Sequence, residues 1–131
     1  MAYTIQQHVD GSFDEVVDRT IDALAEEGFG VLTDADLKAT FAKKLDEEFR
    51  QYRIIGACNP TLAFEALGEE LDLGALLPCN VVVYEADDGS ITVSAVNPGE
   101  LLSVTDNEAL DPIADDVQAR FERVVDAIAE H

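Results

Sequence analysis

The only two cysteines of the chain, Cys58 and Cys79, are the residues whose chemistry stands out. Cys58 is followed directly by Asn59 and Pro60, a pair that is typical of a helix start. Backbone N–H groups at a helix start lower the pKa of a nearby thiol and favour the reactive thiolate. Two such thiols could form a redox couple or hold a soft monovalent metal such as copper.

Whether the two thiols can meet depends on the sheet that carries them. Cys58 closes an apolar segment at 52–58, and Cys79 opens another at 79–85. Parallel strands would place the thiols at opposite ends of the sheet, whereas antiparallel strands would place them at the same end. A plainer interpretation is packing, because free cysteine behaves as a small buried hydrophobe and cytosolic disulfides are uncommon. We favour packing and keep thiol chemistry as the alternative.

Both cysteine segments also carry asparagine and proline, which place amide groups and rigid backbone beside each thiol. Asn59 is expected to cap a helix, and Asn97 to form a turn before a proline. If the two cysteine segments meet, they form a candidate ligand site made of Cys58, Asn59, Pro60, Pro78, Cys79 and Asn80.

Signatures of other chemistries are missing from the sequence. A zinc site needs four ligands, and the two histidines, His8 and His131, lie far from both cysteines in the sequence. There is no nucleophile-elbow, phosphate-loop or zinc-protease motif. We therefore predict no cofactor and favour a non-enzymatic role.

Apolar patterning predicts elements that alternate only in part between strand and helix. Alternating apolar and polar residues predict the first strand, and a run of three valines predicts a buried strand. The pair Asp88-Gly89 predicts the turn of a hairpin. The second helix is expected to point Leu37, Phe41 and Leu45 inward. Strands are predicted at 3–9, 29–33, 52–58, 79–85 and 90–96, and helices at 12–28, 36–49, from 59 and from 111.

These elements predict an α+β fold over one domain, residues 1–131. The final hairpin makes at least part of the sheet antiparallel, which argues against a doubly wound fold. We expect an antiparallel-rich sheet of about four to five strands, backed by helices, with a long C-terminal helix.

Charge is the strongest compositional signal, because 28 Asp and Glu against eight Lys and Arg give a net charge of −20. At about 1 M salt the screening length falls to about 3 Å, so such a surface suits a halophilic cell.

There is no basic patch for nucleic acid and no apolar run of the ~18 residues that a membrane span needs. The segment at 1–13 lacks the features of a signal peptide, so we expect a cytoplasmic protein.

The chain resembles the domain of unknown function 302 family. The resemblance lies in YRIIGACNPTLAFEAL at 52–67 and GALLPCNVVVYE at 74–85, with FGVLTDADLKATFAKKL at 29–45 leading in. It implies a compact α+β domain with an antiparallel sheet, commonly a homodimer, in which the two cysteine segments reach the same end of the sheet. It supplies no reaction. We therefore expect a small-ligand-binding or sensor module that acts as a homodimer, with thiol redox or copper binding by Cys58 and Cys79 as the alternative.

Overall fold

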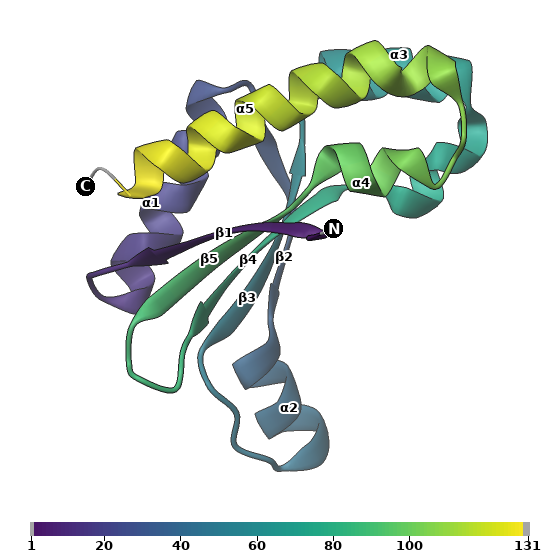
Figure 1. Ribbon diagram of the computed structural model, residues 1–131. Helices are drawn as coiled ribbons and strands as arrows, with labels where there is room; N and C mark the ends of the chain where they lie inside the picture. The colour runs from purple at the N-terminus through teal and green to yellow at the C-terminus, as the bar shows by residue number, and fades with distance from the viewer. Residues whose placement is uncertain (1, 130–131) are drawn as a thin grey trace.

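The computed structural model describes residues 2–129 and contains a five-stranded sheet in the order β1-β5-β4-β3-β2. Every neighbouring pair of strands is antiparallel, which confirms the predicted α+β class. The sheet twists along its length and fans out toward the β4–β5 hairpin (Figure 1). The strands are β1 (Thr4–Val9), β2 (Gly30–Asp36), β3 (Tyr52–Cys58), β4 (Cys79–Glu85) and β5 (Ile91–Val96).

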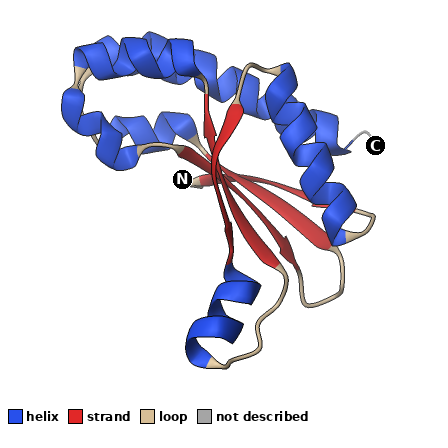
Figure 2. Ribbon diagram, turned by 180° about the vertical axis from the view of Figure 1, so that it is seen from behind, coloured by secondary structure: helices blue, strands red, loops and turns tan. Residues whose placement is uncertain are grey.

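Two long helices, α1 (Phe13–Glu26) and α5 (Asp111–Ala129), cover one face of the sheet (Figure 2). Ser12 caps the start of α1, because its Oγ accepts a hydrogen bond from the backbone N–H of Glu15. Shorter elements gather near the first half of α5: α3 (Pro60–Glu69), the 3-10 turn η1 (Leu71–Leu76), α4 (Pro98–Ser103) and the 3-10 turn η2 (Glu108–Leu110).

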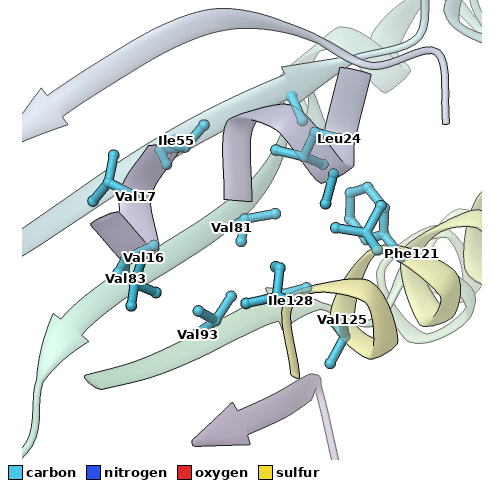
Figure 3. Packing of buried hydrophobic residues seen from close by; sticks show 14 of the residues in the cluster. Val16, Val17, Leu24, Ile55, Val81, Val83, Val93, Phe121, Val125 and Ile128 are labelled. Atoms are coloured by element: carbon cyan, nitrogen blue, oxygen red, sulfur yellow. The ribbon is translucent and has the colours of Figure 1, made fainter. Parts of the chain in front are cut away.

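The main core lies between the sheet and these two long helices. Alternate residues of the central strands point into it, among them Val81 and Val83 of β4, as the two-residue period of a strand requires. Phe121 of α5 is fully buried, and its ring packs against Phe29 with centroids 4.9 Å apart. Figure 3 shows Val81, Val83 and Phe121 converging between strands and helices.

A second, smaller cluster lies beyond the end of the sheet. Its buried members come from α3, η1, α4, η2 and α5: Ala66, Leu73, Leu102, Leu110 and Ala114. The chain therefore builds two apolar clusters, with the short elements attached to the end of the main body by the smaller one.

Two sequence predictions about helices were wrong. Helix α2 (Leu37–Leu45) ends four residues before the predicted Phe49, and none of its residues is buried. It follows the exposed edge strand β2 and runs past the end of the sheet, so its apolar side chains do not reach the core (Figure 1).

Helix α4 was missed because Asn97 caps a helix instead of closing a turn. Its Oδ1 accepts hydrogen bonds from the N–H groups of Gly99 and Glu100.

Among residues 2–129, no helix combines the length and the apolar character needed to cross a bilayer. His131 lies outside the described residues.

Candidate functional site

The two cysteine segments meet at the same end of the sheet. Strands β3 and β4 are antiparallel neighbours in which Ala57 pairs with Cys79, so Cys58 stands one residue beyond that pair. Both thiols are free; Cys79 is buried and Cys58 is half-buried. The antiparallel arrangement that the family resemblance implied is therefore the one the chain adopts.

Both cysteines are among the residues that line a pocket with a volume of about 280 Å³. The pocket lies between the two apolar clusters, because its lining includes members of the main core and members of the smaller cluster. Its wall comes from the end of the sheet and from α3, η1, α4 and α5: Phe29, Leu32, Ala57, Cys58, Asn59, Leu62, Ala63, Ala66, Leu67, Leu73, Gly74, Leu77, Pro78, Cys79, Leu102, Ile113 and Val117.

Four of the six candidate residues line this pocket, namely Cys58, Asn59, Pro78 and Cys79. Pro60 is exposed at the first position of α3 and does not contribute. Asn80 is exposed and lines a separate hollow on the opposite face of the sheet. The reason is the alternation of a strand: if Cys79 points to the covered face, its neighbour must point to the other one.

Asn59 holds the start of α3 against the pocket. Its Oδ1 accepts a hydrogen bond of 3.2 Å from the backbone N–H of Leu62, which confirms the predicted helix cap. Asn59 and Leu62 both line the pocket, so the cap fixes two parts of its wall together. The Leu77–Pro78 peptide bond on the other side of the pocket is cis.

Burial raises the pKa of the Cys79 thiol to about 11, and the charge of a Cys58 thiolate contributes a smaller part of the rise. Removal from water penalises the charged form of a thiol, so Cys79 stays neutral at physiological pH. A neutral buried thiol is a packing group and a weak hydrogen-bond donor, and it is a poor nucleophile.

Other groups add little catalytic chemistry to this region. Within residues 2–129, no three His, Cys, Asp or Glu side chains come together as a metal site would require. His8 lies on the open face of the sheet, where its Nδ1 is 3.1 Å from the Oγ1 of Thr92. The closest ion pair on the sheet, between Arg53 and Asp34, joins β3 to β2 and lowers the pKa of the Asp34 carboxyl through its hydrogen bond.

Most of the pocket wall was not predicted from the sequence. Leu102 and Ile113 reach it from α4 and α5, more than thirty residues after Cys58 along the chain. Their apolar character was visible, but the sequence pattern does not say which helix packs against the end of the sheet. The glycine and proline in Gly74 to Pro78 marked the chain break that forms one side of the pocket.

An antiparallel five-stranded sheet with two helices on one face and a pocket at its end defines a small α+β domain. The model of a family described as "Domain of unknown function DUF302" matches residues 5–128, and the chain belongs to this family.

A solved structure supports the same assignment. The crystal structure of an uncharacterized conserved DUF302 protein from Bacillus stearothermophilus is 28% identical and superposes with a TM-score of 0.90. The alignment covers 97% of this chain and 98% of that chain. A comparison with curated proteins finds no match.

Proposed function

We propose that the protein is a non-enzymatic module that binds a small ligand in the pocket at the end of the sheet. The observation that carries the proposal is the pocket itself, a hollow of about 280 Å³ lined by residues of both cysteine segments. Small-molecule sites are typically concave and apolar, with few polar groups. The neutral state of Cys79 argues against a thiolate nucleophile there and favours binding over catalysis.

A thermal-shift screen in about 2 M KCl tests this proposal. A ligand that binds only the folded protein raises the melting temperature by mass action, by an amount that grows with its concentration. Hits should be lost in Ala63→Leu, which adds bulk to the pocket wall, and kept in Ala25→Leu, the same change on the exposed side of α1. A broad panel with no hit, or hits that survive Ala63→Leu, would contradict the proposal.

The module is further proposed to act as a homodimer through the open face of its sheet and α2. A row of four aromatic rings connects α2 to the open face of the sheet. The ring centroids of Phe41 and Phe49 are 5.1 Å apart, and those of Phe49 and Tyr52 are 6.0 Å apart. The rings of Tyr52 and Tyr84 are stacked, with centroids 5.5 Å apart. A nine-residue helix with no buried residue gains little stability by itself, so α2 needs a partner surface.

Charge favours a second copy of the chain as that partner. Residues 37–50 hold four of the eight basic residues and three of the 28 acidic ones. The rest of the chain therefore carries more than the whole net charge of −20. A weakly basic, apolar helix is complementary to the acidic body of another copy, and a two-fold dimer would use that contact twice.

Sedimentation in about 2 M KCl tests the dimer. Leu45 on α2 is 64% exposed, and Val104, after α4, is 70% exposed. Leu45→Asp should weaken the dimer at least tenfold, whereas Val104→Asp adds the same charge elsewhere and should leave it intact. A wild-type monomer at about 100 μM, or equal dissociation of both variants, would contradict the proposed surface.

A second candidate function is thiol redox or copper binding, favoured by the position of both free cysteines at one end of the sheet and in the wall of one pocket. With oxidised glutathione as the oxidant, the two thiols would lose two protons and two electrons to form one disulfide, and glutathione disulfide would become two thiols. Mass spectrometry after an acid quench should show the loss of two hydrogens in the wild type. Neither Cys58→Ser nor Cys79→Ser should show it.

Competition for Cu(I) against a colorimetric chelator tests the metal version. A wild-type protein that stays reduced and takes no Cu(I) would exclude both versions.

A further inference from the structure

The lining of the pocket is free of charged side chains among the described residues that form it. This is unusual for a chain with 28 acidic and eight basic residues. Its one amide, Asn59, already uses its Oδ1 to cap α3, and the Cys79 thiol is neutral because it is buried. A carboxylate, phosphate or ammonium group would find no opposite charge there, and an unpaired buried charge is strongly unfavourable.

The volume of the pocket sets the size of what it can hold. A closed apolar cavity of about 150 Å³ takes up benzene, a ring of six carbons. In proportion, about 280 Å³ accommodates roughly eleven carbon atoms. Leu32 of the edge strand β2 lines the pocket but is 64% exposed, so the pocket reaches solvent on that side.

The position of the pocket gives a bound apolar group a structural effect. One wall belongs to the main core, through Phe29, Ala57 and Cys79, and the opposite wall to the small cluster, through Ala66 and Leu73. An apolar ligand would contact both clusters and join them into one continuous core. Every methylene removed from water by this contact adds to the affinity.

From these observations we infer that the ligand is an uncharged, hydrocarbon-like group of about ten to twelve carbons, such as a medium-length acyl or alkyl chain or a two-ring aromatic. The inference rests on the proposed ligand-binding function and names its chemical class. Because bound ligand bridges the two clusters, it also holds α3 and η1 against the main body.

A matched series of alcohols and acids tests the inference. The probes are 1-hexanol, 1-octanol, 1-decanol and octanoate, measured by amide chemical shifts in about 2 M KCl, where the net charge of the protein is screened. Each methylene added to the alcohol should lower its dissociation constant about fourfold. Octanoate should bind at least tenfold more weakly than 1-octanol, because its carboxylate is either buried without a partner or kept in solvent beside Leu32, which withdraws part of the chain from the pocket. The alcohols should slow amide hydrogen exchange in α3.

Two variants change the pocket in opposite directions. Ala63→Leu should weaken 1-octanol binding at least tenfold, while Ala25→Leu leaves it unchanged. Leu67→Ala enlarges the pocket and should extend the gain in affinity to longer chains, which keeps the test decisive if Ala63→Leu fails to fold.

The outcomes separate the two proposals. If octanoate binds as tightly as 1-octanol, or affinity does not rise with chain length, the apolar class is wrong. If no alcohol binds but polar ligands shift the melting temperature and are blocked by Ala63→Leu, the inference fails and the ligand-binding function stands. If neither the alcohols nor the broad panel bind, both fail.

Discussion

Ionising Cys79 should destabilise the fold at alkaline pH, and the size of the effect follows from its environment. The pKa of this thiol rises from an ordinary 9.0 to about 11 in the folded protein. Between those values the unfolded chain releases its proton while the folded chain keeps it, so the free energy of unfolding falls as the pH rises. Each pKa unit corresponds to about 1.4 kcal/mol, so the full loss is about 3 kcal/mol, of which about 2 kcal/mol is reached by pH 11.

The assay is urea unfolding of the wild type and of Cys79→Ala at pH 8 and pH 11, in about 2 M KCl. Tyrosines and lysines also titrate in this range, but they are common to both proteins and cancel in the difference. At pH 8 the full contribution of the neutral thiol is present, because that pH is below its unfolded pKa.

The stability advantage of the wild type over Cys79→Ala should therefore shrink by about 2 kcal/mol at pH 11. In Cys58→Ala the loss should be slightly smaller, since the Cys58 charge supplies only the lesser part of the shift. A difference between wild type and Cys79→Ala that stays constant with pH would refute the reasoning, because it would mean that folding does not protect the thiol from ionisation.

Three further predictions concern the surface, the sheet and the pocket wall. The melting temperature, followed by circular dichroism, should be markedly lower at about 0.1 M KCl than at about 2 M, because the net charge of −20 is poorly screened at the lower concentration. An unchanged melting temperature would contradict the salt-adapted interpretation. Gly56→Ala would place a methyl group 2.6 Å from the Pro78 ring and even closer to the Thr33 hydroxyl, so the free energy of unfolding in urea should fall by about 2 kcal/mol. In Gly30→Ala the added methyl group has no neighbour within 4 Å, and the loss should be much smaller. Asn59→Ala should lower stability by about 1 kcal/mol and speed amide exchange at the start of α3; unaltered exchange there would argue against its capping role.

The sequence predicted the central strands best. The bounds of β3 and β4 agree with the prediction, because β-branched runs flanked by proline, asparagine and glycine leave little room for another structure. The helical pattern of Leu37, Phe41 and Leu45 was equally clear, yet these residues do not enter the core. Periodicity shows that one side of a helix is apolar but does not identify the surface that covers it.

The candidate site was predicted in part for a related reason. The cysteine motifs marked two chain segments, and antiparallel pairing of β3 and β4 brought them together. The structure places Asn80 on the opposite face of the sheet from Cys79, because side chains alternate along a strand and the motif does not show this alternation. The far wall depends on how α4 and α5 pack, and long-range packing leaves no local signal in the sequence.

The pairing of β1 with β5 constrains how the chain can reach its fold. Thr4 pairs with Val96, so the first strand cannot enter the sheet until most of the chain has been synthesised. Helix α5, which follows, supplies the buried Phe121 and Ile128 to the same core. Contacts this distant in sequence slow folding, since a long loop must close before they form. The strands β3 and β4 are much closer in sequence than β1 and β5, so the nascent chain should pair its two cysteine-bearing strands well before the core that covers them is complete.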